Sequence, residues 1–242
     1  MRPTWTKTYR TSEAAKTAAL YHSWIRDLGQ LSTPDLLHQD SHTLIFTHVP
    51  GHHPSPDDLP AIASTLAGFH IAACRHLASA QMNQPHDIGR GVIISGFTER
   101  REQRLRHLLA EPSSLNTPLT AEKVSAWMAR VAAHRPTVYK DANIRNFLLT
   151  PDVVAVDFDT LTLAPLGYDL AKLIVSAAMT HGPLNFDLMN TTLTTYNEHL
   201  SQAGLPTCSN EEFTTWLQMH HVLTSPYIGL NGYRFPWQTT SS

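Results

Sequence analysis

The spacing of hydrophobic and polar residues divides the first fifty positions of the chain into four short elements. Residues 4–10 alternate between threonine and larger side chains, which predicts a β-strand. A Thr-Ser-Glu start at 11–13 and helically spaced apolar residues up to Gly29 predict a helix. Two further strands are expected over 36–38 and 43–49, separated by a polar turn. The predicted order is therefore β-α-β-β.

The pattern changes after Pro50-Gly51, where proline and glycine interrupt the chain. Beyond this break, apolar residues recur mostly at helical spacing, and short β patterns occur only in the middle. The helices are expected over 59–80, 96–110, 120–133, 167–180, 186–203 and 210–223, and the strands over 137–139, 147–150 and 153–156. We therefore expect a small N-terminal domain, residues 1–50, with a hinge near 47–51, and a mainly helical domain, residues 51–242.

The overall composition and charge of the chain restrict its function. The 242 residues are 42% hydrophobic, which is enough for a well-buried core. The 18 Lys and Arg against 20 Asp and Glu give a net charge of −2, which excludes the broad basic field of a general nucleic-acid-binding protein. Two cysteines cannot build a disulfide framework, and no apolar segment is long enough to span a membrane. We expect a cytoplasmic protein with no nucleic-acid or membrane partner.

Candidate chemistry is concentrated in residues 138–149 and 153–159. A predicted strand leads Asp141 into a loop, Asn146 follows at the start of the next strand, and a third strand ends at Asp157. Antiparallel pairing would bring Asn146 and Asp157 together beside the loop. Carboxylate and amide oxygens suit Mg²⁺, and a further carboxylate can accept a proton from an attacking hydroxyl group. The alternative is that all three residues cap backbone groups at turns and strand ends.

This spacing resembles the catalytic region of kinase-like phosphotransferases, specifically the aminoglycoside phosphotransferase and choline kinase family. In that family an Asp-x-x-x-x-Asn loop precedes an Asp on a hydrophobic strand, and a Tyr-Asp-Leu-Ala segment follows, here within residues 167–171. The similarity extends over roughly residues 5–225. It implies an α+β, protein-kinase-like two-lobed fold, with a truncated N-terminal small lobe and a mainly helical large lobe.

The resemblance also implies roles for residues of the large lobe. Asp141 would be the base of the catalytic loop, and Asn146 and Asp157 would be ligands of Mg²⁺. Asp159 lies on the same side of an extended chain as Asp157, so it is either a further metal ligand or a turn-capping residue. Asp169 would brace the catalytic loop without taking part in the chemistry.

In the small lobe, the resemblance implies contacts with a nucleotide. Lys7 would be the strand lysine that contacts phosphates, and the alternative is an ordinary solvent-facing lysine. The strand that leads into the hinge would offer backbone groups at Thr47 and Val49 to the adenine. Glu13, in the helix that follows, is a candidate partner for Lys7, although an acid in a first helical turn is also favoured by the helix dipole.

The sequence departs from the family pattern at two places. Tyr139-Lys140 stand where the family has His-Gly before the catalytic Asp. Lys140 either contacts a phosphate or stabilises the Asp141 carboxylate, or it is a solvated loop lysine. Only six residues precede Lys7, too few for the glycine-rich hairpin that covers the triphosphate in this family. Either the translation start lies upstream, or the activity is reduced, or the protein binds without catalysing. Without such a cover, exclusion of water from the site would be poor.

The implied function is transfer of a phosphoryl group from ATP, or another nucleoside triphosphate, to a hydroxyl group of a small molecule, with Mg²⁺ as cofactor. The acceptor would be an aminoglycoside-like antibiotic or another metabolite. The alternative is a non-catalytic nucleotide- or metabolite-binding kinase-like protein that lacks the glycine-rich lid. Four acids of the C-terminal third either attract a cationic acceptor or are ordinary solvated residues: Asp187, Glu198, Glu211 and Glu212.

Overall fold

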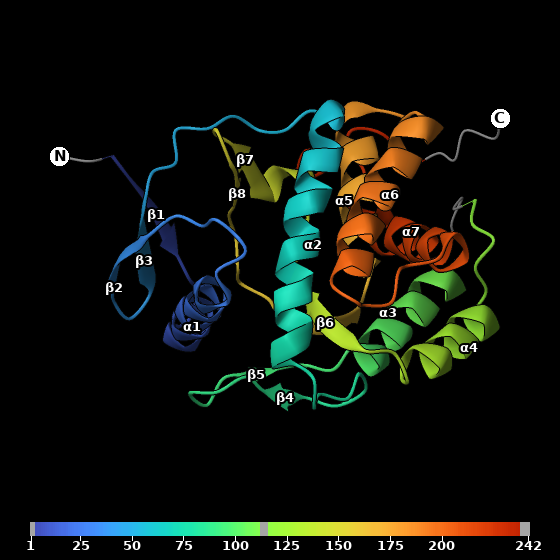
Figure 1. Ribbon diagram of the computed structural model, residues 1–242, viewed down its shortest axis with the longest axis horizontal. Coiled ribbons are helices and arrows are strands. Elements are labelled where there is room, and N and C mark those ends of the chain that lie inside the picture. The colour runs from blue at the N-terminus through green and yellow to red at the C-terminus, as the bar shows by residue number, and fades with distance from the viewer. Residues whose placement is uncertain (1–2, 112–115, 238–242) are drawn as a thin grey trace.

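The first fifty residues form a three-stranded antiparallel sheet with one helix against it (Figure 1). The computed structural model describes residues 3–111 and 116–237. Along the chain the elements are β1 (Thr4–Thr8), α1 (Ser12–Leu28), β2 (Leu36–Gln39) and β3 (Thr43–Thr47). The strands lie in the order β1-β3-β2. The β-α-β-β order predicted from the sequence is present.

Local sequence signals fix both ends of α1. The Thr11 hydroxyl accepts a hydrogen bond from the Ala14 N–H at 3.2 Å, and this contact caps the helix N-terminus. Gly29 ends the helix with a left-handed φ of 68°, a conformation that glycine adopts without steric cost. The apolar face of α1 then packs on the sheet, where Ala18 meets Leu44 in a small separate hydrophobic cluster.

The rest of the chain is built mainly from helices (Figure 1). The elements are α2 (Leu59–His76), α3 (Thr98–Ala110), α4 (Ala121–Val131), α5 (Tyr168–His181), α6 (Phe186–Gln202) and α7 (Asn210–Thr224), with single 3₁₀ turns at Pro56–Asp58, Ile144–Asn146 and Ser225–Tyr227. Helix α2 ends before its predicted end at residue 80, because the Ala80 N–H closes a turn onto the Leu77 carbonyl at 3.0 Å. Within the described ranges, no helix combines the length and the apolar character needed to cross a membrane.

Three pairs of short antiparallel strands connect the helices. They are β4 (His86–Asp87) with β5 (Ile93–Ile94), β6 (Pro136–Tyr139) with β9 (Thr162–Pro165), and β7 (Phe147–Leu149) with β8 (Val153–Ala155). The sequence pattern does not predict β4, β5 or β9, because such short segments become strands only by pairing with a partner. The expectation that the third strand runs to Asp157 is wrong, since β8 ends at Ala155.

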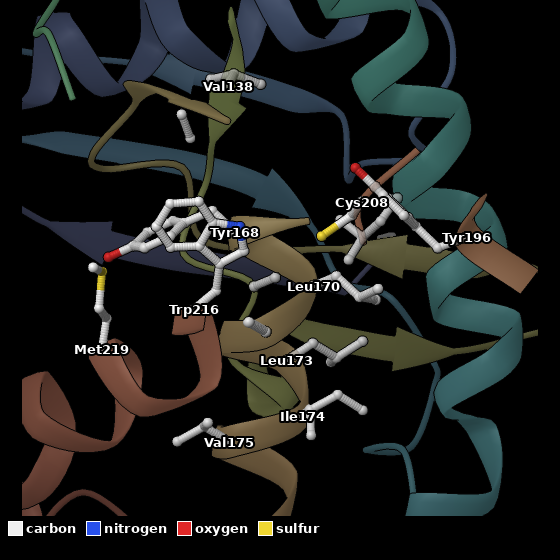
Figure 2. Packing of buried hydrophobic residues seen from close by; sticks show 14 of the residues in the cluster. Val138, Tyr168, Leu170, Leu173, Ile174, Val175, Tyr196, Cys208, Trp216 and Met219 are labelled. Carbon is white, nitrogen blue, oxygen red and sulfur yellow. The ribbon is translucent and has the colours of Figure 1, made fainter. Parts of the chain in front are cut away.

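Helix α5 lies in the middle of the hydrophobic core (Figure 2). Every residue from Tyr168 to Met179 is buried. Figure 2 shows Trp216 of α7 on one side of α5 and Tyr196 of α6 on the other. The Tyr168 ring packs edge-on against Trp216, with 5.6 Å between ring centroids, and against Phe97 at 4.7 Å. These contacts fix the first two turns of α5, which carry Asp169 and Lys172 into the candidate site.

Two backbone bridges join N-terminal segments to the β7–β8 hairpin. Ser32, which follows α1, pairs with Val154 of β8, and the Ala155 N–H donates to the Ser32 carbonyl at 2.8 Å. On the other edge, His52 pairs with Leu149 of β7 through hydrogen bonds of 2.8 and 3.2 Å. Because both edges of the hairpin are held in this way, the segment that follows β8 lies against the small N-terminal sheet.

Candidate active site

Asp141 lies in a tight turn directly after β6. Its φ of 62° is left-handed, which costs about 1–2 kcal/mol for a residue with a Cβ atom. The Asn143 N–H donates to the Asp141 carbonyl oxygen at 2.6 Å, and Asn146 Nδ2 donates to the same oxygen at 3.0 Å. These hydrogen bonds hold the strained residue in place and tie the two ends of the Asp-x-x-x-x-Asn loop together.

Asp169 of α5 supports this loop from below. Its side chain is 1% exposed and accepts hydrogen bonds from the backbone N–H groups of Lys140, at 3.1 Å, and Ala142, at 2.7 Å. His70 Nε2 of α2 lies 3.7 Å from the same carboxylate. The bracing contact expected for Asp169 is present. It links the loop to α5 and, through His70, to α2.

Lys140 is buried beneath the loop. The residue is 1% exposed, and its Nζ atom lies 4.6 Å from the ring centroid of Phe147 and 5.6 Å from that of Phe158. Its ammonium group has no hydrogen-bond partner within the described part of the chain. Burial lowers the pKa of Lys140, and nearby carboxylates, Asp169 foremost, oppose that shift. Lys140 is therefore not the solvated loop lysine that was one of its expected alternatives.

Two side chains hold one oxygen of the Asp141 carboxylate. Tyr139 donates its hydroxyl hydrogen to Asp141 Oδ1 at 2.9 Å, and Lys172 Nζ lies 3.5 Å from the same oxygen. Burial, followed by the Asp141 charge, raises the pKa of Tyr139 well above its usual value, so the phenol keeps its proton. Asp141 Oδ2 has no donor among the residues described, and the side chain is 40% exposed. This second oxygen is free to accept a hydrogen bond from a hydroxyl group.

The β1 strand and the segment after β8 form a second charged group. Lys7 Nζ lies 2.7 Å from Asp157 Oδ1 and 2.6 Å from Asp159 Oδ2. Tyr9, two residues further along β1, donates to Asp159 Oδ1 at 2.9 Å. Partial burial and the Asp159 charge raise the pKa of Tyr9, so it remains a donor. The two carboxylates thus converge on a single positive charge.

The backbone brings Asp157 and Asp159 together by a turn. Asp157 has a φ of 67°, which is left-handed and differs from the extended chain assumed from the sequence. Between them, Phe158 is buried and packs against the His22 ring, with 5.6 Å between centroids. The buried ring anchors the turn, and the two acids on either side of it point to the same partner.

The oxygen atoms present fit a hard divalent cation. Asn146 uses its Nδ2 group on Asp141, which leaves its Oδ1 atom without a donor among the described residues. The Asn146 carbonyl accepts the Val156 N–H at 2.9 Å, so Asn146 lies one residue from Asp157 across the hairpin. No group of three or more His, Cys, Asp and Glu side chains gathers as a metal cluster in residues 3–111 and 116–237. A site of two carboxylates and one amide oxygen suits Mg²⁺, which keeps waters and phosphate oxygens as its other ligands.

The two hinge residues predicted to contact adenine differ in their free backbone groups. The Thr47 N–H donates to the Asp35 carbonyl at 2.9 Å, and the Thr47 hydroxyl accepts the Asp35 N–H at the same distance. The Val49 carbonyl accepts the Gly51 N–H at 2.9 Å, whereas the Val49 N–H has no partner in the described chain. A free donor for a ligand is therefore available at Val49, while the Thr47 amide is already bound.

Several residues considered from the sequence lie away from this site. Glu13 is exposed and makes no ion pair within the described ranges, and Lys7 instead contacts the two aspartates. Glu211 lies 3.7 Å from Arg130, and Glu212 caps α7. Glu211 and Glu212 thus make their contacts with α4 and with the start of α7, and not with Asp141.

Three residues that make contacts in the candidate site are not predicted from the sequence: Tyr9, Lys172 and Tyr233. Lys172 carries a usable signal, because it is the one charged residue in the apolar stretch 170–175 and a buried charge needs a partner. Tyr9 alternates with Lys7 and so lies on the same face of β1, which is a weaker signal. Tyr233 lies in an irregular segment, and nothing in its local sequence predicts contact with the catalytic loop.

Comparisons with known proteins concern the family and the fold of the chain. A family model described as the phosphotransferase enzyme family matches residues 5–204. No curated protein matches the chain in a sequence comparison. Among solved structures, macrolide 2′-phosphotransferase from Brachybacterium faecium is similar over 98% of this chain and 86% of its own, with 14% identity and a TM-score of 0.59.

Two further solved structures have a similar fold. Choline kinase from Streptococcus pneumoniae is similar over 93% of this chain and 76% of its own, with 12% identity and a TM-score of 0.60. An aminoglycoside phosphotransferase from Streptomyces rimosus, in complex with ADP and streptomycin, is similar over 89% of this chain and 85% of its own, with 17% identity and a TM-score of 0.50. These likenesses confirm the α+β, protein-kinase-like two-lobed fold expected from the sequence.

Proposed function

Because this chain belongs to the phosphotransferase enzyme family, with residues 5–204 matching its model, we propose that it transfers a phosphoryl group from ATP to a hydroxyl group of a small molecule. Solved structures of similar fold include kinases of choline and phosphotransferases of macrolides and aminoglycosides. The acceptor proposed here has the same general class, a small metabolite or antibiotic with a free hydroxyl group.

In this proposal each charged group has a separate role. Asp141 accepts a hydrogen bond from the acceptor hydroxyl through its free Oδ2 atom, orients that hydroxyl and takes its proton as the new bond forms. Asn146, Asp157 and Asp159 would hold Mg²⁺, which would neutralise part of the phosphate charge. Lys7, which pairs with Asp157 and Asp159 in the structure, would turn to the phosphates when metal and nucleotide bind. Catalysis then rests on positioning and charge neutralisation, as in other phosphoryl transfers.

One observation carries the proposal. The Lys7 ammonium lies 2.7 and 2.6 Å from Asp157 and Asp159, one residue across the hairpin from Asn146. Two carboxylates thus gather around one positive charge where the small sheet meets the β7–β8 hairpin, and carboxylate oxygens are also the ligands that Mg²⁺ prefers. Asn146 is also hydrogen bonded to the backbone of Asp141, so the proposed metal site and the proposed base share one loop.

The same ion pair favours a second candidate function. Lys7 already pairs with both Asp157 and Asp159, so the charges of the two acids are partly balanced without any ligand. A non-catalytic protein that binds a nucleotide or metabolite between its lobes would need no more than this. The two functions differ in turnover, and Asp141 matters only in the enzyme.

Thermal unfolding with and without Mg·ATP tests the proposal. Ligand at about 100 times its Kd stabilises a protein by about 2.7 kcal/mol, which is roughly 5–10 °C for a chain of this size. We expect this shift for the wild type and its loss for Asp157→Ala. Asp152→Ala, an exposed acid at the tip of the same hairpin, is the control and should keep the shift.

The results of this experiment distinguish the enzyme from the non-catalytic binding protein. Absence of any shift in the wild type would contradict every nucleotide role. A shift without phosphoryl transfer to a panel of hydroxyl compounds would favour the binding protein over the enzyme.

A further inference from the structure

A lysine inside the hydrophobic core reaches the proposed catalytic base. Lys172 lies in the second turn of α5, with only 9% of its side chain exposed. Its Nζ atom lies 3.5 Å from Asp141 Oδ1 and 3.2 Å from the Tyr233 hydroxyl oxygen, to which it donates. Burial lowers the pKa of Lys172, but the Asp141 carboxylate and the Tyr233 hydroxyl together raise it above its usual value. Lys172 is therefore a charged ammonium group beneath Asp141.

Tyr233 fixes this lysine from the opposite side. It comes from the irregular segment after α7, beyond the residues matched by the family model, and is 4% exposed. Its hydroxyl oxygen also accepts a hydrogen bond from Asn143 Nδ2 at 2.9 Å. The Arg145 guanidinium stacks 4.5 Å above its ring, and Gly232 leaves the space that this arginine fills. Residues of the catalytic loop and of the C-terminal segment thus enclose the Lys172 side chain.

The contacts leave the Asp141 carboxylate in one orientation. Tyr139 and Lys172 both engage Oδ1, from two different elements, and a carboxylate held at one oxygen by two partners cannot rotate freely. Oδ2 is then the atom left for the acceptor hydroxyl. Tyr139 alone would permit rotation about its single hydrogen bond, so Lys172 is the second contact that fixes the orientation of the carboxylate.

We propose that Lys172, held by Tyr233, is a positioning residue for the phosphoryl transfer, which it serves by presenting Asp141 Oδ2 to the acceptor hydroxyl. The inference rests on the proposed function and adds to it two residues, one of them outside the matched family region. Lys172 does not touch the reacting atoms. Its effect is on the orientation of Asp141, and so on transfer to the acceptor and not on binding of ATP.

Steady-state kinetics of Lys172→Met test the inference. Loss of orientation at the reacting centre is expected to lower kcat for acceptor phosphorylation by about 10- to 100-fold. The KM for Mg·ATP should stay within about twofold, because the polar contacts of Lys172 in the described chain are with Asp141 and Tyr233 and not with Lys7 or the proposed metal ligands. Lys172→Arg should recover part of kcat. Lys16→Met, an exposed lysine of α1, is the matched control and should behave as the wild type.

The ratio of acceptor phosphorylation to ATP hydrolysis separates positioning from a structural role. A disordered Asp141 should lower transfer to the ordered acceptor more than transfer to water, so the ratio should fall in Lys172→Met. Tyr233→Phe, which keeps the ring against Arg145, should give a smaller loss of kcat of roughly three- to tenfold in the same direction. This milder variant provides the test if Lys172→Met does not fold.

Two results would overturn the inference. One is unchanged kcat and an unchanged ratio in Lys172→Met, or in Tyr233→Phe if only that variant folds. The other is an equal fall in transfer and hydrolysis with a raised KM for Mg·ATP, which would indicate general disruption of the site. Failure of the proposed function itself looks different, because the wild type would then transfer no phosphoryl group.

Discussion

Replacement of Asp169 by asparagine should destabilise the protein more than its single atom change suggests. The carboxylate accepts two backbone N–H groups, from Lys140 and Ala142, at a site that is 1% exposed. An asparagine of the same shape has one accepting oxygen and one NH₂ group. One of the two N–H groups would therefore face another donor and remain unpaired in the core.

The size of the effect follows from these two hydrogen bonds. Leaving a buried N–H unpaired costs about 1–3 kcal/mol, and replacing a charged acceptor by a neutral one weakens the other bond by about 1 kcal/mol. We expect Asp169→Asn to lower the free energy of unfolding by about 3 kcal/mol. For a chain of this size, that corresponds to a fall in Tm of about 6–12 °C. Lys140 adds to the loss of stability. Its buried ammonium group would lose Asp169, the carboxylate that contributes most to offsetting the cost of its burial.

Urea unfolding followed by tryptophan fluorescence measures this change, since Trp216 is fully buried in the native core. Glu198→Gln, which also replaces a carboxylate by an amide but at an exposed position of α6, is the control and should stay within about 0.5 kcal/mol of the wild type. Lys140→Met removes the buried charge. In the Asp169→Asn background it should therefore restore about 1 kcal/mol or more relative to additivity.

An Asp169→Asn variant as stable as the control would refute the bracing of the catalytic loop by Asp169. Strict additivity of Asp169→Asn and Lys140→Met would refute the charge coupling alone and leave the hydrogen-bond argument in place.

Three further predictions concern packing, pH and charge. Gly167→Ala would place a Cβ atom against the Cys208 thiol at a left-handed φ of 84°, so unfolding experiments should show a loss of at least about 2 kcal/mol. Burial lowers the pKa of His22 and places that of His220 well below its usual value; below pH 6.5 the unfolded chain therefore takes up protons that the native state does not. Stability in urea should fall by about 2 kcal/mol between pH 7.5 and 5.5, and a rise would contradict the assignment. Lys7→Met should weaken Mg·ATP binding at least about tenfold in calorimetry, yet change stability by less than about 1 kcal/mol, because this ion pair is partly exposed.

Much of the fold can be predicted because its elements carry strong local signals. Helix α1 has a Thr cap and a terminal glycine, and the helices of the large lobe follow continuous 3.6-residue patterns. Strand β9 and the β4–β5 pair have no such pattern. Their four and two residues become strands only through partners elsewhere in the chain.

The residues of the candidate site also fall into those that local spacing predicts and those that depend on distant parts of the chain. Asp141, Asn146, Asp157 and Asp169 are expected from spacing within one continuous segment. The contact between Asn146 and Asp141 spans only five residues, and those of Asp169 with the loop span 27 and 29. The ion pair of Lys7 with the segment after β8 spans 150 residues, so its geometry depends on how the small sheet meets the large lobe. Strain at Asp157 is likewise invisible in the sequence, because the residue type does not reveal a left-handed backbone.

The most direct measurement of the central claim is transfer of labelled phosphate from [γ-³²P]ATP, with Mg²⁺, to water and to a panel of small hydroxyl compounds. The wild type should form labelled product, and Asp141→Asn should form it at least about 100-fold more slowly while binding Mg·ATP as tightly. Equal rates for the two proteins, or no transfer by a wild type that binds Mg·ATP, would contradict the assignment of Asp141 as the catalytic base.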